Sequence, residues 1–233
     1  MYKNKKIIAI VPARKSNDTI EELNLKHLGD RPLISYTLES AVQSSLIDKV
    51  YLSTEDEGIS GLASEYEIEV PFLRPLELTE KNVTAREVAA HMLSQLSEDF
   101  DVVIILMPNA PFRGSNIIDE GIRFTIDNNY EKIRGVSQLK DYFLSELDIK
   151  GENNSNLIRG ANTPQLVEKT VVAGGLYIYQ TSRLLLKNDT LPFENYFIPR
   201  HESTLIKSLY DLLIAERLVN LNNLLIASLI EST

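Results

Sequence analysis

The residues with the clearest potential for chemistry follow the first apolar run of the chain. Ile7 to Val11 have the length and composition of a buried strand, and the loop Pro12-Ala13-Arg14-Lys15-Ser16-Asn17-Asp18 comes directly after it. In an open α/β sheet, ligands bind at the carboxyl ends of the strands, where neighbouring loops diverge. The guanidinium of Arg14 can contact a ligand there, or it can pair with a surface carboxylate. This loop is therefore the first candidate binding segment.

The same sequence excludes several common sites. No glycine lies between Val11 and Gly29, whereas a Rossmann dinucleotide fingerprint and a Walker loop both need glycines for close backbone approach to phosphate. No Gly-x-Ser-x-Gly elbow is present, which removes a simple α/β-hydrolase. His27, His91 and His201 are isolated and lack metal-ligand spacing, so we interpret them as solvated or packed side chains.

The segments that must position the loop alternate between strand and helix patterns. This alternation predicts an α/β fold with a three-layer, doubly wound, mostly parallel sheet. The expected strands are Ile7 to Val11, Val50 to Ser53, Val70 to Leu73, Asp101 to Met107 and Val171 to Tyr179. The expected helices are Pro32 to Ser45, Glu55 to Tyr66, one that Thr84 opens, Ser115 to Asn129, and one from about Ser208 to the end. We expect one domain over residues 1–233, with a hairpin about Gly151.

Composition narrows the class of protein. The net charge of −9 and the pI near 5 argue against a nucleic-acid partner, which needs clustered lysine and arginine. The chain has no cysteine, so neither a disulfide framework nor a thiolate metal site is possible, and a cytoplasmic location is the default. The basic start, Met1 to Lys6, leads into an apolar run that Pro12 stops, which indicates a first strand and no signal peptide or membrane span.

Several motifs in sequence order together resemble the acylneuraminate (nonulosonic acid) cytidylyltransferase family, over about Ile7 to Glu216. They are Pro12-Ala13-Arg14, Asn24, Pro32-Leu33-Ile34, Leu52-Ser53-Thr54, Phe72-Leu73-Arg74-Pro75 and Leu106-Met107-Pro108-Asn109-Ala110-Pro111-Phe112-Arg113. The resemblance implies a nucleotide-diphospho-sugar transferase-like fold. It also implies a reaction in which the anomeric hydroxyl of a sialic-like sugar acid attacks the α-phosphate of CTP and releases pyrophosphate, with Mg²⁺ as the expected cofactor.

The resemblance also implies roles for individual residues. It assigns nucleotide binding to Arg14, Asn24, Arg74 and Arg113, and substrate binding to Gly174 and Tyr177. It identifies no catalytic residue. It further implies a homodimer formed through a small β insertion at about residues 136–170. Independently of the resemblance, apolar residues surround much of the segment from Leu209 to Ile230, and they predict that this C-terminal helix extends the interface.

Several positions depart from the family pattern. Asp18 stands where the family has a phosphate-binding lysine, and Leu205 and Lys207 stand where it has two late aspartates that hold Mg²⁺. An apolar side chain cannot ligate a hard cation and an ammonium opposes its binding. Lys15 is a possible substitute for the lysine. Another metal site would need carboxylates from the following set: Asp18, Glu55, Asp56 or Asp211.

Two functions from different classes remain open after this comparison. The first is a divergent enzyme that transfers CMP from CTP to a nonulosonic acid. The second is a non-catalytic paralogue that retains the fold to bind CTP or CMP, a sugar acid or a protein partner. Family resemblance favours the first, whereas the replaced phosphate and metal residues favour the second.

Overall fold

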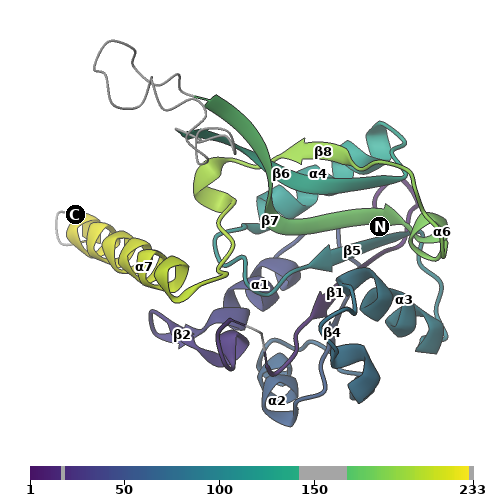
Figure 1. Cartoon of the computed structure of the whole chain (residues 1–233), viewed down its shortest axis with the longest axis horizontal. Helices are drawn as coiled ribbons and strands as arrows, with labels where there is room; N and C mark the ends of the chain where they lie inside the picture. The colour runs from purple at the N-terminus through teal and green to yellow at the C-terminus, as the bar shows by residue number, and fades with distance from the viewer. Residues whose placement is uncertain (17–18, 142–166, 231–233) are drawn as a thin grey trace, which may run out of the picture.

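A six-stranded sheet forms the centre of the protein in the computed structural model, which describes residues 1–16, 19–141 and 167–230 (Figure 1). The strand order is β4-β1-β5-β7-β6-β8. The strands are β1 (Ile7–Pro12), β4 (Lys49–Ser53), β5 (Val102–Leu106), β6 (Lys132–Asp141), β7 (Val167–Gln180) and β8 (Glu194–Phe197). Only β7 within this sheet is antiparallel to its neighbours, while the other adjacent strands pair in parallel. The expected mostly parallel sheet is confirmed.

Helices cover both faces of the sheet. On one face lie α1 (Leu33–Val42), α2 (Glu57–Glu65) and α4 (Ser115–Asp127), which pack against Ile7, Ala9 and Val11 of β1. On the other face lie α3 (Ala85–Gln95) and α6 (Thr181–Leu184), which pack against Ile8 and Ile10. Alternate residues of one strand therefore enter two separate cores, as the pleat of a β-strand requires. This arrangement confirms the three-layer fold.

Local sequence explains why these elements begin where they do. All six residues of β1 and all five of β5 are buried, which suits strands covered on both faces. Thr84 and Glu87 form a capping box at the start of α3, as their spacing predicts. Asp56 caps α2 by accepting a hydrogen bond from the backbone amide of Ile59 at 2.9 Å. The helix starts next to the strand ends are thus set by short-range hydrogen bonds.

Smaller elements surround the end of the sheet where β1 terminates. They are the 3₁₀ helices η1 (Leu23–Leu25), η2 (Leu76–Thr79) and η3 (Arg200–Glu202), and the short pair β2 (His27–Leu28) and β3 (Arg31–Pro32). The last helix, α7 (Leu209–Ile230), projects from the body in Figure 1. None of the helices in the described ranges is both long enough and apolar enough to cross a membrane.

One expected strand is absent from the described structure, and one expected hairpin cannot be assessed. Val70 to Leu73 is not a strand, and the isolated bridge between Glu69 and Tyr51 lies just before this segment. Pro71 has no amide hydrogen to donate to a ladder, and the side chain of Leu73 is about half exposed, so an added strand would gain little. The hairpin about Gly151 lies outside the described residues.

A buried ion pair lies at the start of β6. The ammonium of Lys132 pairs with the carboxylate of Asp189, and the two side chains are 4% and 1% exposed. Arg183 also contacts Asp189, at 3.2 Å. Burial opposes ionisation of Asp189, but hydrogen bonds from Lys132 and from the amide of Leu191 bring its pKa below the ordinary value. The charged carboxylate is therefore part of the folded state.

We predict that Asp189→Asn lowers the free energy of unfolding at neutral pH by about 3 kcal/mol, because it leaves the buried ammonium of Lys132 without its counter-ion. The folded-state pKa lies below the unfolded value of about 4. The contribution of Asp189 is therefore present above that value and is lost as the pH falls through the folded-state pKa. Urea unfolding of both proteins from neutral to acidic pH measures this. The exposed Asp99→Asn is the control, and equal stabilities at neutral pH would contradict the prediction.

Candidate functional site

The loop after β1 lies at the carboxyl edge of the parallel strands. The backbone amide of Ala13 donates to the carbonyl of Ser53, at the end of β4, over 2.9 Å. The side chain of Arg14 is half-buried and its Nη1 donates to the carbonyl of Thr79 at 3.4 Å. Asn24 is buried, and its Nδ2 donates to the carbonyl of Arg14 at 2.8 Å. Asn24 therefore holds the backbone of the loop that presents Arg14.

Arg74 belongs to the same edge. Its backbone amide donates to the carbonyl of Thr54 at 2.8 Å, and its Nη2 donates to Oε2 of Glu55 at 2.5 Å. The other carboxylate oxygen of Glu55 accepts from the backbone amide of Lys15 at 2.7 Å. Glu55 thus links the loop that carries Arg14 to Arg74. The bridge through Glu55 was not foreseen, although Glu55, like Arg74, follows an apolar segment at this edge.

A second ionic contact joins the loop to the start of α2. Nζ of Lys15 lies 3.1 Å from Oδ2 of Asp56 and 3.8 Å from Oε1 of Glu22. The hydrogen bond that Lys15 donates to Asp56, and the charges of Asp56 and Glu22, raise the pKa of Lys15. The amide of Ile59, together with Lys15, lowers the pKa of Asp56. Lys15 thus places an ammonium at the loop, next to carboxylates of this chain, and its role as a substitute for the family's lysine stays a prediction.

Arg113 has a different environment from Arg14. Its side chain is almost fully buried, with 1% of the residue exposed. Nη1 donates to the carbonyls of Gly174 and Gly175 at 2.7 and 2.9 Å, and Nη2 donates to Oγ1 of Thr37 at 3.3 Å. Burial lowers the pKa of Arg113 to about 9. These contacts give Arg113 a supporting role behind the site, and direct contact with a nucleotide stays a prediction.

The two glycines that Arg113 contacts form an irregular turn within β7. Gly174 and Gly175 have φ values of +67° and +56°. A residue with a Cβ atom would be strained in this left-handed region. A Cβ on Gly174 would lie 2.4 Å from Ile198, and one on Gly175 would lie 2.8 Å from Met107. Backbone conformation and close packing therefore explain both glycines without a ligand. Substrate contact by Gly174 stays a prediction.

Tyr177 lies further along β7, two residues after Gly175. It pairs in register with Ile105 of β5, and its ring packs edge-on against Phe193 with centroids 6.0 Å apart. Burial raises the pKa of Tyr177, so its hydroxyl stays protonated over the physiological range. Its ring packs with the core that contains α3, apart from the charged loop. Contact between Tyr177 and a substrate also stays a prediction.

The two positions that the resemblance assigns to Mg²⁺ binding lie at the carboxyl edge of the sheet, but their side chains cannot bind the ion. The backbone amide of Ile206 donates to the carbonyl of Asn109 at 2.9 Å, which brings residues 205–207 to the loop after β5. The flanking side chains are Leu205 and Lys207, neither of which ligates Mg²⁺. Among the residues that the structure describes, no group of three or more histidines and carboxylates could hold a metal. These residues do not fit the ion.

The proposed alternative carboxylates are already engaged. Asp56 caps α2 and contacts Lys15, and Glu55 bridges Lys15 to Arg74. Oδ2 of Asp211 accepts from the backbone amides of Lys207 and Ser208, both at 2.9 Å, at the start of α7. Asp18 lies outside the described residues. A metal site built from this set stays an untested prediction.

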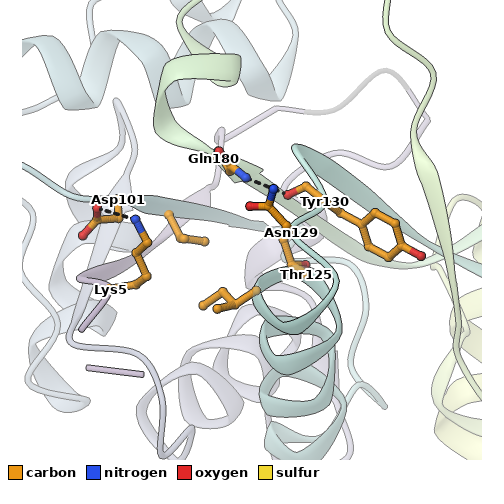
Figure 2. A pocket seen from close by; sticks show the side chains of 8 residues that line it. Lys5, Asp101, Thr125, Asn129, Tyr130 and Gln180 are labelled. Atoms are coloured by element: carbon orange, nitrogen blue, oxygen red, sulfur yellow. Dashed lines mark hydrogen bonds and ion pairs between the residues drawn. The ribbon is translucent and has the colours of Figure 1, made fainter. Parts of the chain in front are cut away.

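A small pocket on the opposite edge of the sheet is unsuited to a nucleotide. Figure 2 shows that Lys5 and Asp101, near the amino ends of β1 and β5, face Gln180 and Tyr130 across it. Lys5 donates to Asp101 at 3.2 Å, and Gln180 donates to the carbonyl of Tyr130 at 3.2 Å. Its volume is about 90 Å³, whereas ligand pockets usually hold about 300–1,000 Å³. The candidate site is the carboxyl edge.

Comparison with known proteins identifies the family of the chain. A family model described as cytidylyltransferase matches residues 8–145, a range that includes β1, its loop, Arg74 and Arg113. The chain belongs to the cytidylyltransferase family. The sequence-based resemblance is therefore confirmed at the level of the family.

Curated members of this family differ in how much of their length the chain matches. The N-acylneuraminate cytidylyltransferase of Escherichia coli O18:K1:H7 is 36% identical over 118 residues, which are 51% of this chain but only 28% of that enzyme. The pseudaminic acid cytidylyltransferase of Campylobacter jejuni serotype O:23/36 is 26% identical over 228 residues, 94% of this chain and 98% of that enzyme. The chain thus matches one relative in full length and another in part.

A solved structure supports the fold. The CMP:2-keto-3-deoxy-manno-octonic acid synthetase in complex with CTP superposes with a TM-score of 0.69, covering 94% of this chain and all of the other. The two sequences are 12% identical, so this likeness concerns the fold of the family and no individual residue.

We predict that Arg113→Ala lowers the free energy of unfolding by about 3 kcal/mol or more, because two buried carbonyls and the hydroxyl of Thr37 lose their donor and a cavity remains. Arg123→Ala, on the exposed side of α4, is the matched control and should change stability by less than about 0.5 kcal/mol. Denaturant unfolding of the three proteins measures both values. Equal midpoints for Arg113→Ala and the control would show that the buried contacts contribute little.

Proposed function

We propose that the protein transfers CMP from CTP to a nonulosonic acid and releases pyrophosphate. The single observation that carries this proposal is the family match that spans the loop at the carboxyl edge of the sheet. The full-length similarity to a pseudaminic acid cytidylyltransferase favours a sugar acid as the acceptor. The fold places Arg14, Lys15 and Arg74 at this edge, where positive charge would meet a triphosphate.

The proposed reaction is a displacement at the α-phosphorus. A bond forms between the anomeric oxygen and the α-phosphorus, the bond from that phosphorus to the bridging oxygen breaks, and pyrophosphate leaves while the hydroxyl proton passes to solvent. Such a transfer depends on positioning and on cations that offset the phosphate charge. Arg14 is the residue of this chain best placed to contact the nucleotide. The family typically uses Mg²⁺, but the residues described above do not fit it, so no step is assigned to it.

A cavity at the same edge supports the acceptor half of the proposal. It has a volume of about 480 Å³ and is lined by Ser137, Gln138, and the segment from Phe197 to Arg200. Ile198 in its wall packs against Gly174, one of the residues implied in substrate binding. The guanidinium of Arg200 offers a partner for the carboxylate of a sugar acid. We therefore place the sugar acid between Gly174 and Arg200.

The non-catalytic function retains one specific observation in its favour. Leu205 and Lys207 flank Ile206, whose amide and carbonyl are both bonded to Asn109 next to the candidate site. Carboxylates at these two positions would face the ligand region, whereas this chain has an apolar and a cationic side chain there. A protein that binds CTP or CMP without turning it over would keep the loop and Arg14 and would not need the metal.

We predict that the full chain releases pyrophosphate from CTP when a nonulosonic acid is supplied, and that Arg14→Ala lowers kcat/KM by about 100-fold by removing a cation that contacts phosphate. A coupled pyrophosphate assay across a panel of nonulosonic acids measures this. Lys26→Ala, an exposed side chain beyond the loop, is the control. If no acceptor gives turnover while calorimetry shows that CTP binds and Arg14→Ala weakens binding, the non-catalytic function is correct.

Assembly is a separate part of the proposal. We infer a homodimer, formed through the insertion at about residues 136–170 and extended by α7. Residues 142–166 of the insertion lie outside the described residues. In α7, Leu212 and Ala215 pack against the β2–β3 region, whereas Leu209, Leu213 and Leu221 are 62%, 61% and 55% exposed. A helix with a second, exposed apolar side favours a further partner surface.

We predict that light scattering on the intact chain gives about twice the 26.3 kDa of one chain, and that truncation after Asn220 weakens the dimer because it removes the last turns of α7. A monomeric mass for the intact protein rejects the dimer. An unchanged dimer after truncation rejects the contribution of α7 alone and leaves the insertion as the interface.

A further inference from the structure

The carboxylate of Glu55 joins two groups that belong to the candidate phosphate site. Oε1 accepts from the backbone amide of Lys15 at 2.7 Å, and Oε2 accepts from Nη2 of Arg74 at 2.5 Å. The side chain of Glu55 is 12% exposed and that of Arg74 is 3% exposed. One internal anion therefore spans the gap between the loop after β1 and the segment that carries Arg74.

The two donors that Glu55 uses are of the kind that bind phosphate. A backbone amide in a loop at a strand end and the guanidinium of an arginine both bind phosphate oxygens with the geometry in which they bind a carboxylate. Arg74 also retains unused capacity, because its Nε is buried and has no hydrogen-bond partner among the described residues. The guanidinium of Arg74 can thus bind more acceptor atoms than Glu55 supplies.

The ammonium of Lys15, which belongs to the same loop, also contacts carboxylates of the chain. Nζ of Lys15 lies 3.1 Å from Asp56 and 3.8 Å from Glu22, although its side chain is about half exposed. The backbone amide of Lys15 contacts Glu55, and its ammonium contacts the neighbouring residue, Asp56. In this arrangement the carboxylates of the chain engage the same groups that a polyphosphate would use.

We propose that Glu55 acts as an internal competitor for phosphate, occupying the place of a ligand phosphate group between the loop amide and Arg74. Binding of a polyphosphate then requires the carboxylate to move away. The inference rests on the proposed function for the identity of the ligand, and it adds a residue that sets how tightly the site holds pyrophosphate. The opposing interpretation is that Glu55 only positions Arg74 for the ligand. The two differ in sign, since loss of the carboxylate strengthens binding in the first and weakens it in the second.

The test is a calorimetric titration of inorganic pyrophosphate into the full chain. Glu55→Gln removes the charge but keeps the size of the side chain, and we expect it to bind pyrophosphate about tenfold more tightly than the unsubstituted protein, because a like charge at the site is gone. Glu57→Gln makes the same change of charge on an exposed residue two positions along, and it should stay within about twofold. Unchanged or weaker binding by Glu55→Gln overturns the proposal.

A second variant covers the case in which Glu55→Gln does not fold. Glu55→Asp keeps the charge, but its side chain is one methylene shorter and cannot reach both the amide of Lys15 and Arg74. It therefore frees one donor, and about threefold tighter pyrophosphate binding is expected. Binding no tighter than that of the unsubstituted protein overturns the proposal, and thermal melting of each variant establishes that it is folded.

The outcome is separable from that of the proposed function. Tighter pyrophosphate binding by Glu55→Gln, together with no release of pyrophosphate from CTP by any variant, supports the competitor role of Glu55 and rejects the transferase function. Turnover of CTP together with unchanged or weaker binding by Glu55→Gln supports the transferase function and rejects the competitor role.

Discussion

The buried guanidinium of Arg113 is the interaction on which the carboxyl edge of the sheet depends. It joins the loop after β5 to the carbonyls of Gly174 and Gly175 in β7 and to Thr37 of α1. None of these partners carries a negative charge, and burial lowers the pKa of Arg113 to about 9. The antiparallel strand β7, the middle of α1 and the loop after β5 are thereby fixed relative to one another.

The edge that Arg113 fixes carries the charge arrangement on which the proposed phosphate binding depends. Asn24 binds the backbone of the loop that carries Arg14. Lys15 and Arg74 form ion pairs with carboxylates of the same chain. A carboxylate at a phosphate site lowers affinity for a polyanion. The same site is then suited to release a product such as pyrophosphate, or to bind a nucleotide only weakly. Both consequences follow from the internal ion pairs.

Much of the fold and part of the site are predictable from the sequence. The buried strands β1 and β5, the capping box of Thr84 and Glu87, and the position of the Arg14 loop follow from short-range patterns. The expected strand at Val70 to Leu73 was wrong because an apolar run does not reveal whether a neighbouring edge offers a ladder, and the isolated bridge at Glu69 lies just before it. The roles implied for Gly174 and Tyr177 stay predictions.

The sequence by itself determined the family, the layered α/β architecture and the set of cationic residues at strand ends, because these depend on periodicity and on residue type at fixed spacing. The tertiary structure alone decided the partner of each charge. Arg14 and Arg113 look alike as arginines that follow strands, yet one lies in the open loop and the other is buried against carbonyls. Glu55 meets Arg74 across 19 positions of sequence. Burial and long-range contacts determine the charge and the accessibility of a side chain. Local sequence does not predict burial or long-range contacts.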